Sequence, residues 1–192
     1  MMADEGFSVT GRRLVGYALR WGAIGQVRKG GENLEEVVKR GSFAASIAAG
    51  GVRLCIDHDY GAMVASQADG TLTLVEDHVG LLVDAVAHNT EHGDLAMSAT
   101  RSRSKAGLSV GFVRAIDNVF YRGDVKTREI IDCHLREVSV CRNPCYRSSE
   151  IHAGRLRIER FLADSQAANR RARLDQLARA EAEMAAAVRT LA

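Results

Sequence analysis

The sequence predicts an α+β fold that is mainly β and ends in a helical tail. Between residues 52 and 87, short apolar runs are separated by polar turns, a spacing typical of a barrel or sandwich with many antiparallel strand pairs. Residues 89–105 interrupt the strands with apolar positions at helical spacing. From Asp164 the composition shifts to Ala, Arg, Glu and Leu, which favours a long helix.

Local patterns predict the elements in order. Residues 7–19 are expected to form one strand, or two with a bend near Gly11, and the glycine-rich residues 21–31 a loop. Two short helices are expected within residues 32–49, ending at Gly50-Gly51. Thr90 can cap the later helix. The remaining strands are expected at residues 52–56, 63–66, 71–75, 80–87, 105–112 and 127–140, with a turn region over 117–124.

Two segments are expected, a domain over residues 1–162 and an Ala- and Arg-rich helical tail over 163–192. Apolar residues in the tail recur at steps of three and four, with Glu181 filling one step. These residues, called the tail seam below, are Leu174, Leu177, Met184, Val188 and Leu191. Such a seam packs either on a partner helix or on the chain's own domain.

Composition excludes several function classes. With 26 basic and 24 acidic residues, the chain shows no sign of general nucleic-acid or membrane-surface binding. No apolar run reaches the length of a membrane span, and the acidic start lacks the features of a signal peptide, so we expect a cytoplasmic protein. The cysteines Cys55, Cys133, Cys141 and Cys145 form no Cys-x-x-Cys pair, which favours buried free thiols over a structural zinc site. We expect no cofactor and no metal.

Residues 107–112 (GLSVGF) place one serine between two glycines in a strand. Because alternate residues of a strand share a face, Ser109 lies with Gly107 and Gly111, opposite an apolar face. Such a serine is either a candidate nucleophile or part of a bulge or tight packing site. For a nucleophile, the glycines are expected to leave the face open for a substrate backbone.

A serine nucleophile needs a base, and the base needs an orienting partner. His58 ends an apolar strand between Asp57 and Asp59. Glu137 lies in residues 135–140 (LREVSV), where regular alternation would group it with Cys133, Leu135 and Ser139, and His134 with the opposite face. A buried strand carboxylate requires a partner. That partner is either a histidine or an arginine, such as Arg101 or Arg114.

Together, Asp57-His58-Asp59, the Ser109 strand and the Glu137 strand, with Asn143-Pro144 just beyond, resemble the prohead protease family of tailed phages. This family is similar in fold to herpesvirus assemblin, and related proteins occur in phage-derived gene transfer agents. The resemblance covers roughly residues 10–152. It implies a serine endopeptidase on an antiparallel β-barrel surrounded by short helices.

The resemblance also implies roles for individual residues. Ser109 would be the nucleophile, His58 the general base and Glu137 the third member, with His134 as the alternative third member. Arg142, just beyond the Glu137 strand, could support the oxyanion. The implied substrates are the scaffolding region and the major capsid protein, cleaved inside the assembling procapsid in the host cytoplasm. A homodimer is expected, because such a protease must be restrained until it is enclosed.

Two other function classes remain open. A catalytically inactive scaffold or assembly protein of the same fold would account for the helical tail. A metal hydrolase could use His58 with Asp57 or Asp59, but adjacent strand residues point to opposite faces and make a poor ligand set. The pair His88 and His92 has helical spacing, but Glu91 does not stand where a His-Glu-x-x-His metal site requires it.

Overall fold

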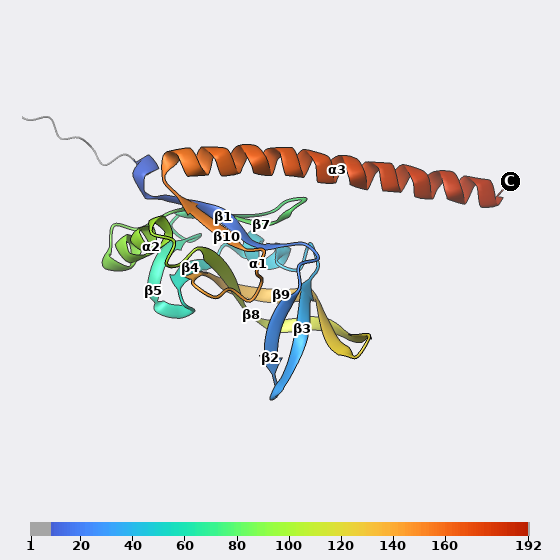
Figure 1. The fold of residues 1–192 in the computed structure, drawn as a ribbon, viewed down its shortest axis with the longest axis horizontal. Coiled ribbons are helices and arrows are strands. Elements are labelled where there is room, and N and C mark those ends of the chain that lie inside the picture. The colour runs from blue at the N-terminus through green and yellow to red at the C-terminus, as the bar shows by residue number, and fades with distance from the viewer. Residues whose placement is uncertain (1–8, 192) are drawn as a thin grey trace, which may run out of the picture.

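The computed structural model describes residues 9–191, and the fold is α+β and mainly β, as predicted (Figure 1). The described elements are η1 (Val9–Arg12), β1 (Arg13–Arg20), β2 (Gly25–Lys29), β3 (Glu32–Val38), α1 (Ala44–Ala49), β4 (Arg53–Ile56), β5 (Asp59–Ser66), β6 (Leu72–Glu76), β7 (Gly80–Val86), α2 (Glu91–Arg101), β8 (Gly107–Arg122), β9 (Val125–Cys141), β10 (Glu150–Ala153) and α3 (Arg155–Leu191).

The strands form two sheets rather than one closed cylinder within residues 9–191. One sheet has the order β10-β1-β7-β6, and the other has the order β2-β3-β9-β4-β5 with β8 paired to β9. Most pairs are antiparallel, as expected, but β9 runs parallel to both β3 and β4. Within the described chain, the two sheets are therefore not joined into the closed barrel that was expected.

The long strand β9 organises the second sheet. One edge of β9 pairs with β8 over most of its length, and the other pairs first with β3, up to Ile130, and then with β4, from Glu137. Helix α1 lies against this edge of β9 between Ile130 and Glu137, where neither β3 nor β4 pairs with it. The Ser42 hydroxyl lies 3.0 Å from the Ile130 carbonyl oxygen, and Ser46 Oγ accepts the Leu135 N–H at 2.9 Å. The Ser42 hydroxyl also lies 3.0 Å from the Ile131 carbonyl oxygen, so the two serines satisfy backbone groups of β9 between its pairings with β3 and β4.

Four sequence predictions were wrong, and short turns explain three of them. Residues 25–29, expected to lie in a loop, form β2. Residues 32–38 form β3 rather than a helix, because Gly30 and Gly31, both with positive φ, close a two-residue hairpin between β2 and β3. Strand β8 continues to Arg122, and the hairpin turn is confined to Gly123-Asp124 rather than spread over 117–124. Strand β10 was not predicted at all.

Other predictions were confirmed. Helix α1 ends at Gly50, whose φ of 74° is left-handed, and Thr90 Oγ1 accepts the Gly93 N–H at the start of α2. The first expected strand begins at Arg13, after the short helix η1, while Phe7 and Ser8 lie outside the described residues. All four cysteines are free thiols, three of them buried, and burial raises the pKa of Cys55 to about 11.

The second sheet has one apolar and one polar face near its centre. Leu54, Val138 and Leu108 lie in the main hydrophobic cluster and are completely buried. Since Leu54 is in register with Val138, and Cys55 with Ser139, the neighbouring residues of β4 and β9 turn the other way. Ser139 is in turn opposite Ser109 of β8. This polar side carries the candidate site and is called the site face below.

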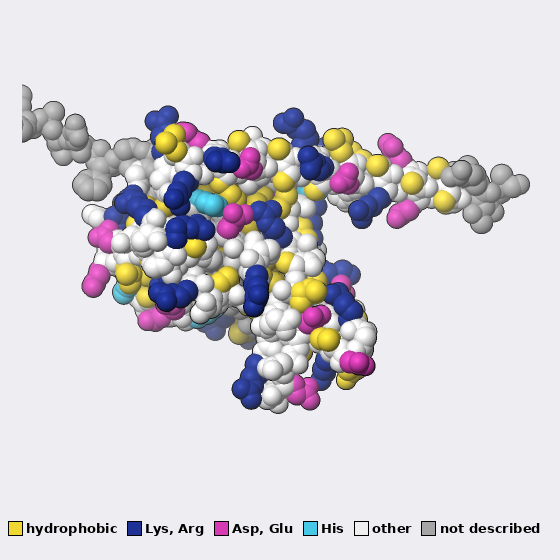
Figure 2. Space-filling view, in the orientation of Figure 1, with side chains coloured by type: hydrophobic (Ala, Val, Ile, Leu, Met, Phe, Trp, Pro, Cys, Tyr) yellow, Lys and Arg dark blue, Asp and Glu magenta, His cyan; other side chains and the backbone are white. Residues whose placement is uncertain are grey.

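Helix α3 lies along the first sheet and then projects beyond it (Figure 1). Its first turns pack on β1, where the Phe161 and Tyr17 rings meet edge to face with centroids 5.6 Å apart. The helix runs without a break past the expected boundary at residue 162. Leu174, Leu177 and Met184 of the tail seam are between 52 and 62% exposed, and Figure 2 shows apolar side chains among charged ones along this segment. The side chains of Val188 and Leu191 are outside the described set.

In the part of the chain that is described, no helix combines the length and the apolar character needed to span a membrane.

Candidate active site

A tight turn positions His58 above the sheet. Asp57 and His58 are the two loop residues between paired Ile56 and Asp59, and both have positive φ (49° and 65°). Two such residues in succession define a type I′ turn, which normally uses Asn and Gly. Non-glycine residues in this region are strained, and such strain is concentrated at functional sites. Lys105, two residues before β8, also contacts this turn, because its ammonium group forms an ion pair with the Asp57 carboxylate.

His58 is held by two contacts with β9. Its Nδ1 lies 2.6 Å from Glu137 Oε1, and its backbone N–H donates to Ser139 Oγ at 3.0 Å. Ser139 Oγ in turn donates to Glu137 Oε2 at 2.6 Å. Both carboxylate oxygens are therefore occupied, which compensates for the burial of a side chain that is only 3% exposed.

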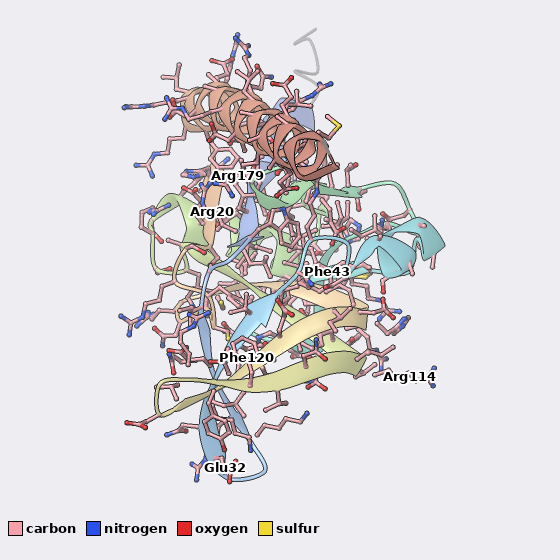
Figure 3. All side chains as sticks on the ribbon, turned by 90° about the vertical axis from the view of Figure 1, so that its right-hand side faces the viewer. Arg20, Glu32, Phe43, Arg114, Phe120 and Arg179 are labelled. Carbon is pink, nitrogen blue, oxygen red and sulfur yellow. The ribbon has the colours of Figure 1, made fainter. Side chains whose placement is uncertain are left out.

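The two arginines that could have paired with Glu137 do not. Arg101 donates to the Gly11 carbonyl oxygen at 2.8 Å. Arg114 lies at a bulge in β8 and points away from the sheets (Figure 3). Of the two partner types open from the sequence, the structure selects the histidine.

The pairing with Glu137 decides the protonation of His58. Because an ionised carboxylate only accepts hydrogen bonds, Nδ1 carries the proton, and Nε2 of the neutral ring has a free lone pair. The hydrogen bond that His58 donates to Glu137 raises the pKa of His58 above its usual value, against the opposing effect of burial. The Glu137 and Asp57 charges act in the same direction. The ring is thus oriented to accept a proton at Nε2.

Ser109 lies on the site face, one strand from this pair. It is opposite Ser139, and the next residue on its face, Gly111, is opposite Glu137. Ser109 is only 5% exposed, and its hydroxyl has no hydrogen-bond partner within residues 9–191. The structure therefore brings His58 and Glu137 into contact and places Ser109 on the same face, with no hydrogen bond between Ser109 and His58.

The flanking glycines do not leave an open face, contrary to expectation. A Cβ atom at Gly111 would lie 2.8 Å from Glu137 Cδ, so the space beside Gly111 holds the carboxylate. A Cβ atom at Gly107 would lie 2.7 Å from Pro144 Cγ, so that space holds the proline ring. Each glycine permits a close approach within the protein.

Because of a bulge in β9, some of its side chains lie on the other face of the sheet from the one that regular alternation predicts. Gly111 pairs with Glu137, but its neighbour Phe112 pairs with Leu135, so one residue of β9 is extra. Leu135 therefore faces the core, away from Glu137, and His134, opposite Val113, lies on the site face instead of the opposite one. His134 nevertheless makes no contact with His58 among the described hydrogen bonds, and Glu137 takes the position beside the ring.

Arg142 lies one residue beyond β9, whose last residue Cys141 is opposite Gly107. Its Nε donates to the Ser104 carbonyl oxygen at 3.2 Å, and the side chain is exposed. This bond ties Arg142 to the loop before β8, and no hydrogen bond joins it to Ser109 or His58 within the described chain.

Sequence reasoning did not assign a role to Ser139 or Lys105, although each left a signal. Ser139 follows Glu137 by two residues in a strand, which already placed the two on one face. The signal for Lys105 was weaker, because a lysine before a strand is ordinary. Its pairing with Asp57 depends on the proximity of the β8 start to the turn after β4, which only the fold creates.

A serine on the same sheet face as an oriented histidine–carboxylate pair is the set of groups that a serine hydrolase uses. The family model of the caudovirus prohead serine proteases matches residues 1–164, and the chain belongs to this family. It is thus a serine peptidase of the type that acts in phage capsid maturation, with capsid proteins as the implied substrates and the procapsid in the host cell as the implied place of action. A search of curated proteins found no match.

Proposed function

We propose that this chain is an endopeptidase that cleaves the scaffolding region and the major capsid protein inside the procapsid. In this proposal Ser109 is the nucleophile, His58 the general base and Glu137 the orienting carboxylate. The observation that carries the assignment is the 2.6 Å bond from His58 Nδ1 to Glu137, made on the face where Ser109 lies. It leaves Nε2 as the ring's proton acceptor.

The chemistry follows from these positions. As Ser109 Oγ forms a bond to the scissile carbonyl carbon, its proton passes to His58 Nε2, and Glu137 stabilises the imidazolium. The Nε2 proton then passes to the leaving amine as the C–N bond breaks. Water next attacks the acyl-enzyme, giving one proton to His58 Nε2, and the ester bond to Ser109 breaks as His58 returns that proton to Ser109 Oγ. Each oxyanion donor is typically worth roughly 3–4 kcal/mol, and Arg142 is proposed as support for these donors.

Several features of the proposal concern assembly. The catalytic unit is assigned to residues 1–162, and the tail, residues 163–192, to contacts with a second copy or with the assembling head. The exposed tail-seam residues Leu174, Leu177 and Met184 support such contacts. We propose that the protein is a homodimer, and a gene transfer agent is a possible setting as well as a phage head.

The test is co-expression with the cognate capsid protein, followed by N-terminal sequencing of the products. Ser109→Ala removes one hydroxyl that has no hydrogen-bond partner among the described residues, so we expect cleavage to be abolished and the unfolding temperature to be unchanged. Ser98→Ala, at an exposed serine on α2, is the matched control and should cleave normally.

A serine-directed fluorophosphonate separates the protease from an inactive scaffold of the same fold. Labelling should be stoichiometric in the parent protein and absent in the Ser109→Ala variant. Cleavage by that variant would refute the nucleophile assignment, and an unlabelled protein in an assembled sample would favour the scaffold.

A further inference from the structure

A cavity of about 250 Å³ lies beside the candidate active site. Its polar lining comes from Arg53, Tyr60, His134 and Arg136, and helix α1 closes one side with Ser46 and Ala49. None of these side chains has a part in the proposed proton transfers. The cavity therefore needs its own explanation.

The sheet register places this cavity on the site face. Arg53 is directly opposite Glu137 in the parallel pair of β4 and β9, and directly opposite residues of adjacent strands turn to the same side. Arg136 is the residue next to Glu137 at the bulge, and His134 was brought to this side by the same bulge. The cavity and the His58–Glu137 pair are consequently neighbours on one surface.

The cavity lining contains two arginines and no acidic residue. The guanidinium carbons of Arg53 and Arg136 lie 5.9 and 5.1 Å from the centre of the Tyr60 ring, so the tyrosine holds both side chains in place. Neither arginine side chain forms an ion pair or a hydrogen bond within residues 9–191. The adjacent Asp59 carboxylate accepts the Gly61 N–H instead.

We propose that this cavity is a substrate subsite that binds an aspartate or glutamate side chain near the scissile bond. Two guanidinium groups fixed on an aromatic ring match the charge and the planar geometry of a carboxylate. Arg53 is two strands from Ser109, a separation of roughly 10 Å at the usual strand spacing. An extended chain covers about 3.3 Å per residue, so the acidic residue lies about three or four positions from the scissile bond.

This inference rests on the proposed function and is tested with the junction that N-terminal sequencing identifies. An Asp or Glu is expected within four residues of that junction, and its absence would overturn the proposal. Peptides that span the junction are then compared with versions in which each acidic residue is replaced by its amide. In the parent protein, one amide replacement should lower kcat/KM about tenfold or more, mainly through KM.

The double variant Arg53→Gln/Arg136→Gln should lose this discrimination, so that acidic and amide peptides give nearly equal kcat/KM. Arg28→Gln, at an exposed arginine on β2, should retain it. Equal discrimination in the double variant and the parent would overturn the subsite while leaving the protease intact. If the parent cleaves none of the peptides and is not labelled at Ser109 by fluorophosphonate, the proposed function fails, and the subsite with it.

Discussion

Gly111→Ala should inactivate the enzyme by displacing Glu137, without replacing any member of the proposed triad. The new Cβ atom would lie 2.8 Å from Glu137 Cδ and 3.2 Å from its Cγ, with the nearer carboxylate oxygen closer still. Carbon atoms pack at roughly 3.5–4.0 Å, so the carboxyl carbon must retreat by about 0.7 Å or more and its oxygen further. A shift of about 1 Å lengthens the 2.6 Å bond to His58 beyond hydrogen-bond range.

The Gly111→Ala variant is expected to lose most of its catalytic activity. Loss of the orienting carboxylate interaction in a serine protease lowers kcat by up to about 10⁴-fold, so we expect a fall of about 10²- to 10⁴-fold. Because Glu137 is buried, weakening its contact with His58 should also cost up to about 3–5 kcal/mol of stability. Peptide-cleavage kinetics and urea unfolding measure the two effects, and NMR titration should show a lower pKa for His58.

The control for this substitution is Gly11→Ala, where the new methyl group meets no atom within 4 Å and φ is not positive. It should behave like the parent protein in both assays. Full activity of the Gly111→Ala variant, with an unchanged pKa of His58, would refute the conclusion that Gly111 exists to make room for Glu137.

Three further predictions concern side chains of β9 and a helix α1 side chain that contacts β9. Glu137→Gln keeps the shape but removes the charge that raises the pKa of His58, so the acid limb of the pH–rate profile should move to lower pH while the plateau falls; a limb that moves to higher pH would contradict this, because His58 must be neutral to accept a proton. Ser139→Ala removes a charge-assisted hydrogen bond and should cost about 1.5–3 kcal/mol in urea unfolding, with a cost below about 0.5 kcal/mol as the contrary result. Ser46→Ala leaves the buried Leu135 N–H unpaired and should cost about 1–3 kcal/mol in the same assay; an unchanged unfolding midpoint would show that another group satisfies it.

Much of the fold could be predicted because the signals are local. Alternating apolar residues located β4, β6 and β7 to within one or two residues, and a polar cap located α2. The misassigned helix at residues 32–38 shows where a local signal fails. In residues 32–38 the apolar positions Leu34, Val37 and Val38 fit a helix as well as a strand, and the hairpin pairing with β2 decides between them.

The candidate site was predictable as a set of residues but not as a geometry. The sequence by itself determined the serine strand, the histidine at a strand end and the carboxylate strand, and their order along the chain was enough for the family resemblance. Which partner Glu137 takes could not follow from sequence, because His58, Arg101 and Arg114 were all chemically suitable. That choice depends on which strands are neighbours.

Only the tertiary structure decided which side chains lie beside the glycine-flanked serine. Strand periodicity assigns faces correctly only while the pairing is regular, and the single extra residue at the β9 bulge moved Leu135 to the core and His134 to the site face. The same register set Glu137 against Gly111 and Arg53 against Glu137. Contacts between strands far apart in the chain carry this information, and no local pattern encodes them.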